Sequence, residues 1–174
     1  TESELPIAIL LTGDVVWDTM AFLPRVKRAF ESLGVPVYAV IGNHDHNAEV
    51  QNDDEAVGLF VEHFGPTDYS FNRGQVHFVV MDNIQCTSVD GFGDSKTWNY
   101  DGGYTSKQIA WLEKDLDAVD DKANKMVILS GHIPFRGGRS SGGSNVNKDN
   151  GYADVLNLLS QFKEAHICIG HTHY

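Results

Sequence analysis

Val37-Tyr-Ala-Val-Ile-Gly-Asn-His-Asp45 is a short run of apolar, mostly β-branched residues that ends in glycine and continues at once into side chains that bind metals. Residues 7–14, 126–132 and 166–173 repeat this pattern. Continuous apolar runs of this length are typical of strands buried on both faces of a parallel sheet, whose carboxyl ends face ligands at one edge. We therefore expect five side chains to meet in one crevice, namely Asp14, Asn43, His132, His171 and His173.

Each of these motifs alone has an ordinary explanation. Gly13-Asp14 is typical of turns, and the residues from Asn43 to Asp45 suit a polar loop with local hydrogen bonds. His171 and His173 are more specific, because residues two apart in extended backbone point the same way about 6.5–7 Å apart. That spacing suits two imidazoles that reach two ions about 3.5–4 Å apart. Four motifs at four predicted strand ends favour a metal site.

The composition favours one acidic domain. The chain has 174 residues, of which 41% are hydrophobic, enough for a single core, and we take residues 1–174 as one domain. Its formal charge of −11 disfavours extended contacts with nucleic acid. No apolar stretch approaches the roughly 20 residues needed to span a bilayer, so a soluble protein is expected. Cys86 and Cys168 indicate no disulfide framework, and neither compartment nor oligomeric state is indicated.

Strands and helices alternate along the chain. The patterns predict strands near residues 7–12, 37–41, 126–130 and 166–169, and a hairpin over 69–82. Helices are expected between Pro24 and Gly34, over 57–64, after a capping box formed by Thr105 and Gln108, and over 152–162. Residues 87–103 show no period and are expected to form a long loop near the site. The glycine-rich residues 136–145 are expected at its rim.

The order of the motifs resembles the calcineurin-like metallophosphoesterase family. The matching motifs are Gly13-Asp14, Gly42-Asn43-His44-Asp45, Gly131-His132 and Gly170-His171-Thr172-His173. Residues 69–82 and Gln108-x-x-Trp-Leu also resemble the branch that includes purple acid phosphatases. The resemblance implies an α/β fold (α+β in some schemes), a two-layer β-sandwich flanked by helices around two adjacent metals.

The same resemblance implies a role for each site residue. Asp14 would bridge the ions, Asn43, His132 and His171 would complete one of them, and His173 would bind the other. His44 would face the scissile ester and help to stabilise or protonate the departing oxygen, and Asp45 would orient His44 through a carboxylate–imidazole hydrogen bond. Mixed nitrogen and oxygen ligands suit Mn, Fe or Zn rather than Ca²⁺.

One family motif is absent from the sequence. An aspartate and a histidine separated by one residue should end an earlier strand, but nothing before Ile7 supplies them, and the chain stops one residue after His173. We interpret the sequence as a partial catalytic domain, truncated at both ends. One metal site would be nearly intact and its neighbour would lack two ligands, which could abolish activity in the isolated stretch.

The expected function is hydrolysis of a small phosphate monoester or diester through a dinuclear metal centre and a metal-bridging hydroxide. One alternative is a catalytically inactive metal-binding or ligand-binding module on the same fold, and another is a nuclease with a small cleft. His63, His77 and His166 are expected to be packing or surface residues, and His46, which follows the motif, could only line it. Arg136 and Arg139 suit either phosphate contacts or solvated side chains. Asp82 ends a strand as the site residues do, but the resemblance gives it no ligand role. Trp98, Tyr100 and Tyr104 suit either a substrate-facing wall or a packed aromatic loop.

Overall fold

The computed structural model describes residues 8–135 and 150–173. The glycine-rich stretch predicted at the rim of the site lies outside the described residues. The strands are β1 (Ile9–Thr12), β2 (Val37–Val40), β3 (Tyr69–Arg73), β4 (Val76–Val80), β5 (Ile84–Asp90), β6 (Thr97–Gly102), β7 (Met126–Ser130) and β8 (Glu164–Cys168). The α-helices are α1 (Leu23–Glu31), α2 (Asp53–Ala56), α3 (Gly58–Phe64), α4 (Ser106–Asp117) and α5 (Tyr152–Leu159). Short 3₁₀ turns are η1 (Met20–Phe22), η2 (Asn43–Asp45), η3 (Gly93–Ser95) and η4 (Lys122–Asn124).

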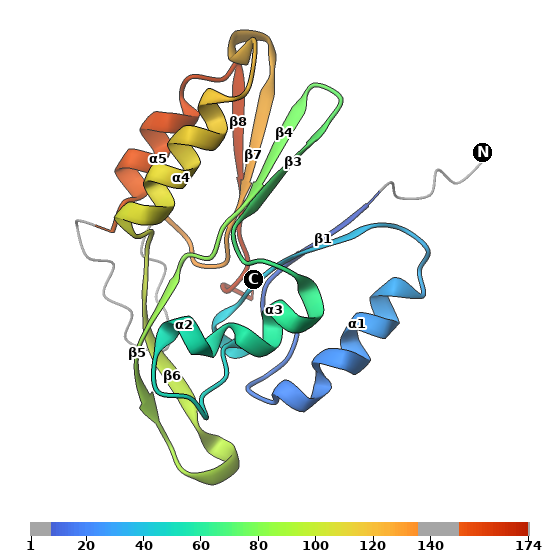
Figure 1. Ribbon diagram of the computed structural model, residues 1–174, viewed down its shortest axis with the longest axis vertical. Helices are drawn as coiled ribbons and strands as arrows, with labels where there is room; N and C mark the ends of the chain where they lie inside the picture. Colours follow the sequence, from blue (N-terminus) through green and yellow to red (C-terminus); the bar gives the residue numbers. More distant parts are fainter. Residues whose placement is uncertain (1–7, 136–149, 174) are drawn as a thin grey trace.

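The described strands form three sheets. β1 pairs with β2 in parallel, and a second sheet has the order β3-β4-β7-β8, in which β4, β7 and β8 are parallel and β3 pairs antiparallel with β4. β5 and β6 form an antiparallel arm (Figure 1). The parallel strands are the apolar runs identified in the sequence, which confirms the predicted mixed α/β architecture.

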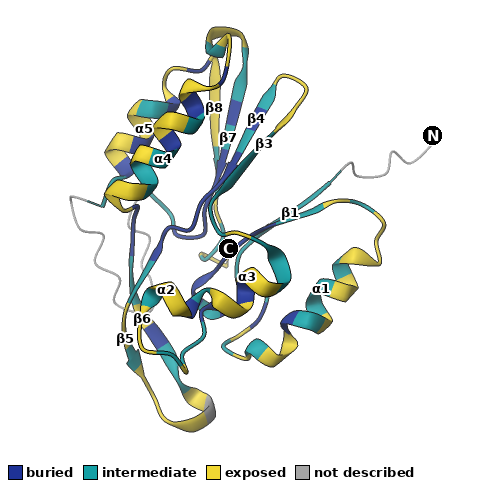
Figure 2. Ribbon diagram, viewed as in Figure 1, coloured by how far each residue is buried: buried dark blue, intermediate teal, exposed yellow. Residues whose placement is uncertain are grey.

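Two apolar clusters hold the layers together. Helices α4 and α5 cover one face of the four-stranded sheet, where Leu112 and Val155 pack against Leu129 (Figure 1). On the other side of the molecule, Leu23 of α1 and Phe60 of α3 pack with Ile41, which directly follows β2. The buried residues follow the strands and the inward faces of the helices (Figure 2). Full burial of one such side chain contributes about 1.5–3 kcal/mol.

The predicted capping box begins α4. The Gln108 backbone N–H donates to Thr105 Oγ1 at 3.3 Å, and the Thr105 N–H donates to Gln108 Oε1 at 2.9 Å. A cap of this kind is worth about 1 kcal/mol. The Gln108 side-chain amide also donates to the Asp82 carbonyl and to both carboxylate oxygens of Asp68, so this residue ties the helix to the end of β4.

Residues 87–103 differ from the prediction. We expected an aperiodic loop, but most of this stretch belongs to the β5–β6 hairpin. The register shifts between Cys86 and Ser88, and such a bulge interrupts the alternation by which a strand is recognised in sequence. Trp98 is buried and its Nε1–H donates to the Asn47 carbonyl at 2.9 Å, which fixes the arm to the segment after η2. None of the described helices is both long and apolar enough to cross a membrane.

Candidate metal centre

The carboxyl ends of strands from two sheets meet at one place. Asp14 follows β1, Asn43 begins the turn after β2, His132 follows β7 and His171 follows β8. The Asn43 amide oxygen lies 3.1 Å from His132 Nε2 and 3.0 Å from His171 Nδ1. Asp14 Oδ2 lies 3.2 Å from His132 Nε2. The structure thus brings together four of the five side chains predicted to converge.

His132 is held in a state that suits a metal ligand. Its Nδ1 lies 2.7 Å from the Thr12 carbonyl oxygen, which can only accept, so Nδ1 carries a proton. In the neutral ring Nε2 then presents a lone pair, and it faces the Asp14 carboxylate and the Asn43 amide oxygen. Three electron-pair donors therefore point at one another in a buried place, since His132 is 1% exposed. A shared cation is the partner that satisfies all three.

The electrostatics of the cluster follow from burial and from these close contacts. Burial acts to raise the pKa of Asp14, but the hydrogen bond and charge of His132 outweigh it and the pKa is lowered. Burial, reinforced by the neighbouring His132, lowers the pKa of His171. Both shifts favour the forms that bind a cation, an ionised carboxylate and a neutral imidazole.

Several site residues have strained backbones. Asp14, Asp18, His171 and His173 have φ angles of 53°, 54°, 66° and 49°, in the left-handed region that costs a residue with a side chain about 1–2 kcal/mol. The close approach of the two strand ends requires Gly42, because a Cβ there would lie 2.1 Å from the Asp14 backbone nitrogen. The strained backbone conformations and the close contact at Gly42 bring these side chains to one place, and the rest of the fold offsets their energetic cost.

The predicted hydrogen bond between Asp45 and His44 is wrong. The Asp45 carboxylate is buried and accepts backbone N–H groups from Val15, Val16 and Gly42, at 3.2, 2.9 and 2.8 Å. Burial raises the pKa of Asp45 to about 6, against the effect of these donors. A carboxylate that already accepts three N–H bonds ties the β1 and β2 loops together and is turned away from the neighbouring imidazole.

His44 instead pairs with Asp18, which the sequence analysis missed. His44 Nδ1 lies 3.0 Å from Asp18 Oδ2, and Trp17 stacks on the ring with centroids 3.7 Å apart and planes 19° apart. Asp18 follows Asp14 by four residues in the loop after β1, and that short spacing is the only signal in the sequence that could have identified it.

His173 lies at the margin of the cluster. Its Nε2 is 4.0 Å from Asp14 Oδ2, and its side chain is 64% exposed. The ring also lies near Trp17, with centroids 6.3 Å apart. Its expected part as a ligand of a second ion stays a prediction.

Asn83 is a second residue that the sequence analysis missed. It is fully buried after β4, its Oδ1 accepts the N–H groups of His132 and Ile133, both at 2.9 Å, and its Nδ2 donates to the Ile133 carbonyl. These bonds fix the turn that carries His132. The signal in the sequence was a polar pair, Asp82-Asn83, directly after an apolar run.

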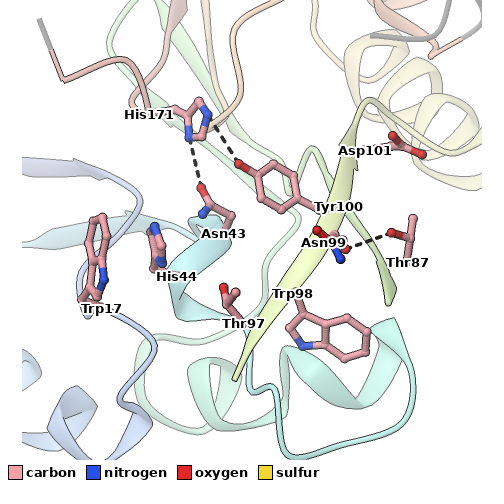
Figure 3. A pocket seen from close by; sticks show the side chains of 10 residues that line it. All are labelled: Trp17, Asn43, His44, Thr87, Thr97, Trp98, Asn99, Tyr100, Asp101 and His171. Carbon is pink, nitrogen blue, oxygen red and sulfur yellow. Dashed lines mark hydrogen bonds between the residues drawn. The ribbon is translucent and has the colours of Figure 1, made fainter. Parts of the chain in front are cut away.

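A pocket of about 460 Å³ opens beside the cluster (Figure 3). Tyr100 of β6 extends toward His171, with its hydroxyl 3.5 Å from Nε2, while Trp17 and His44 form the opposite side (Figure 3). Tyr100 thus belongs to a wall of the pocket. Trp98 also lines the pocket although most of its surface is buried, whereas Tyr104 packs in the core with Tyr152.

The remaining candidates lie elsewhere or outside the described residues. His77 is buried between Asn72 and Asp115, and His166 is exposed beside Glu164. His63 lies in α3. Arg136 and Arg139 are not among the described residues.

The fold and the site define a protein in which side chains of the kinds that bind metals cluster at the carboxyl edge of its parallel strands. The model of the family described as calcineurin-like phosphoesterase matches residues 3–174, and the chain belongs to this family. This confirms the resemblance seen in the motifs.

Relatives and a solved structure agree with this assignment. The chain is 25% identical over 174 residues to a probable glycerophosphodiester phosphodiesterase, GpdQ, of Arcobacter nitrofigilis, covering 97% of this chain and 57% of that protein. It is 24% identical to the manganese-dependent ADP-ribose/CDP-alcohol diphosphatase of Mus musculus, covering 99% and 64% of the two. The fold is similar to a purple acid phosphatase, PPD1, from yellow lupin (Lupinus luteus), with a TM-score of 0.60 and 15% identity, over 95% of this chain and 30% of that one. The chain therefore spans less than two thirds of the length of each.

Proposed function

We propose that this chain carries the catalytic residues of a metal-dependent phosphoesterase that hydrolyses a small phosphate monoester or diester at a dinuclear centre. The observation that carries the proposal is the meeting of the Asp14 carboxylate, the Asn43 amide oxygen and the His132 Nε2 lone pair, which need a common cation. The family supports the reaction class, and the mouse relative is named as manganese-dependent.

The residues divide between two ions. Asn43, His132 and His171 would hold one ion together with Asp14, and Asp14 and His173 would contribute to the second. Imidazole, amide and carboxylate ligands suit Mn, Fe or Zn. When bound, such ions supply an activated water at neutral pH and neutralise charge on the phosphoryl oxygens.

His44 is placed to serve the departing oxygen. It lies in the pocket wall next to Asn43, and its Nδ1 is held by Asp18, so its Nε2 is the nitrogen left to face a substrate. Protonation of a leaving oxygen by a positioned side chain contributes about 10²–10⁴-fold in rate. Trp17 stacks on the ring, and Asp18 is a positioning residue that accepts the Nδ1–H, so the proton given to the departing oxygen would come from Nε2 of the doubly protonated ring.

The substrate is expected to be small. The relatives are named for glycerophosphodiesters and for ADP-ribose or CDP-alcohols, and the pocket of about 460 Å³ is of a size for such molecules. The formal charge of −11 argues against a long nucleic-acid strand.

The test combines metal analysis with hydrolysis of p-nitrophenyl phosphate and bis(p-nitrophenyl) phosphate by the full-length protein supplied with Mn²⁺ or Zn²⁺. We expect Asn43→Ala and His132→Ala to reduce bound metal and rate together. His166→Ala, which changes an exposed histidine away from the cluster, is the matched control and should keep both. Bound metal with no turnover in the unaltered protein would favour the inactive binding module.

A further inference from the structure

A second group of metal-binding side chains lies on the other side of the η2 turn. His46, Asp53 and Cys86 each offer one ligand atom, and these atoms lie within 4.8 Å of one another. His46 directly follows η2, Asp53 begins α2, and Cys86 lies at the bulge of β5. None of them makes a hydrogen bond or ion pair with a described residue of the centre built around Asp14, and His46 was expected from the sequence only to line the motif that it follows.

His46 has an unpartnered nitrogen in a buried place. Its Nδ1 lies 2.9 Å from the Gly42 carbonyl oxygen, which requires a proton on Nδ1. The other ring nitrogen, Nε2, makes no hydrogen bond to any described residue, although the residue is only 1% exposed. An imidazole whose Nδ1–H is fixed by a backbone carbonyl, with a free Nε2 lone pair, has the arrangement of a metal-ligating histidine.

The two carboxylates near Nε2 offer it no hydrogen-bond donor. Asp82 Oδ2 lies 3.5 Å away, while Asp82 Oδ1 accepts the Ile84 N–H at 2.9 Å. Asp53 Oδ1 accepts the Cys86 N–H at 2.8 Å, which holds the carboxylate beside the thiol. Two carboxylates, a thiol and an imidazole lone pair are thus gathered around one small volume.

We propose that His46 Nε2, Cys86 Sγ and the Asp53 carboxylate form a second metal site, separate from the proposed catalytic centre, that binds Zn²⁺ or a similar borderline transition metal. Mixed nitrogen, sulfur and oxygen ligands suit zinc and exclude a preference for Ca²⁺ or Mg²⁺. Tetrahedral zinc with bonds of about 2.0–2.3 Å places its ligand atoms about 3.5 Å apart, so side-chain movements of at most about 1 Å bring the three atoms, which lie within 4.8 Å of one another, to that spacing. Asp82 Oδ2, which faces His46, is the carboxylate available for the fourth position.

A protonated His46 paired with Asp82 is the competing explanation. Burial acts to lower the pKa of His46, but the Asp82 carboxylate outweighs it and raises the pKa. This pair would satisfy one nitrogen, yet the distance of 3.5 Å comes without a hydrogen bond and the pair leaves Cys86 beside two carboxylates. A bound dication deprotonates a coordinating thiol, and its positive charge also offsets the negative charges of the carboxylates.

The position of the site indicates a structural role. Its ligands come from the segment after η2, from α2 and from β5 of the β5–β6 arm. The turn η2 itself carries Asn43 to the pocket, and β6 of the arm carries Tyr100. A metal here would fasten the arm to the turn that bears the catalytic residues. It would not itself face the substrate.

Cobalt(II) titration of the full-length protein tests the site, because only a cysteine ligand gives the thiolate-to-cobalt charge-transfer absorption in the near ultraviolet. We expect this absorption to appear on addition of Co²⁺, to vanish in Cys86→Ser, and to persist in Cys168→Ser, the matched control. Asp53→Asn should weaken the apparent affinity at least tenfold without removing the thiol. Circular dichroism of each variant checks that it is folded.

The result also separates this site from the proposed catalytic centre. The double variant Asn43→Ala/His132→Ala should keep the absorption while losing hydrolysis. Absence of the absorption in the unaltered protein, or its survival in Cys86→Ser, would overturn the proposal. Zn²⁺ should also slow alkylation of Cys86 in the double variant by at least tenfold, and an unchanged rate would count against the site.

Discussion

His44 Nδ1 lies 3.0 Å from Asp18 Oδ2, and the neighbouring Asp45 carboxylate is engaged with backbone N–H groups instead. The two aspartates therefore have different tasks. Asp18 fixes the orientation of an imidazole in the pocket wall, while Asp45 joins the loops that follow β1 and β2. This distinction can be tested by changing each carboxylate to its amide.

Asp18→Asn should reduce kcat about 10- to 100-fold with little change in KM, because the neutral amide removes the negative charge that strengthens the hydrogen bond from His44 Nδ1. The loss should be larger for an alkyl phosphodiester than for a p-nitrophenyl ester, since a poor leaving group needs protonation more. Steady-state kinetics on both substrates measure the difference. Equal losses on both would mean that Asp18 acts on the fold rather than on His44.

Asp45→Asn provides the contrast. The asparagine amide keeps one oxygen that accepts, but its NH₂ group would face backbone N–H groups that now donate to the carboxylate. An N–H group left without an acceptor in this buried place should lower the free energy of unfolding by about 1–3 kcal/mol. Urea unfolding of the metal-free protein should show this loss, whereas Asp18→Asn should unfold nearly as the unaltered protein does.

Gly42→Ala should weaken metal binding at the proposed catalytic centre at least tenfold. The new Cβ would lie 2.1 Å from the Asp14 backbone nitrogen and 2.2 Å from its Oδ1, so the carboxylate must move. Gly58→Ala is the control, because no atom lies within 4 Å of its Cβ and alanine stabilises the helix by about 1 kcal/mol. Titration calorimetry with Mn²⁺ compares the two, and equal affinities would show that the Gly42 contact is relieved without moving Asp14.

Asp68 should make folding stability depend on pH. Burial, aided by the charge of Asp82, raises its pKa from 3.8 to about 6. The folded state then binds the proton more tightly than the unfolded state, so its stabilising contribution is complete below about pH 3.8 and is lost as the pH rises through about 6. The loss amounts to about 1–3 kcal/mol.

Urea unfolding of Asp68→Asn at several pH values measures this contribution with chelator present. The asparagine side chain at position 68 does not titrate, whereas Asp68 loses its stabilising proton as the pH rises. The free energy of unfolding of the variant, relative to that of the unaltered protein, should therefore increase between about pH 4 and about pH 6. The exposed Asp120→Asn should show a constant difference over the same range. A constant difference for Asp68→Asn as well would contradict the raised pKa.

The convergence of the main ligands could be predicted from the sequence because it depends on local patterns. Apolar runs that end in glycine identify buried strands, and the residue after each run lies at the carboxyl edge of the sheet. Asp14, Asn43, His132 and His171 were found in this way. The partners of each strand were not predictable, because the order β3-β4-β7-β8 depends on pairings between segments far apart in the chain.

The supporting residues escaped prediction for related reasons. Asp18 sits in an irregular loop with a φ of 54°, where no periodicity indicates the direction of a side chain. Asn83 acts through backbone groups 49 and 50 residues away. The bulge between Cys86 and Ser88 interrupts the alternation of β5, so the strand was not recognised in the sequence. The proximity of Cys86 to His46 could therefore not be predicted.

The hydrogen bond from His132 to the Thr12 carbonyl joins β7 of one sheet to β1 of another, and Asp14 and Asn43 face His132 and His171 across the same boundary. An ion bound there would connect the sheet that contains β1 and β2 to the sheet that contains β7 and β8. The free energy of metal binding then also stabilises the packing of the two sheets against each other. Removal of the metal by a chelator should weaken this packing, and binding of the metal without substrate should strengthen it. Resistance to proteolysis and affinity for the ion should rise and fall together.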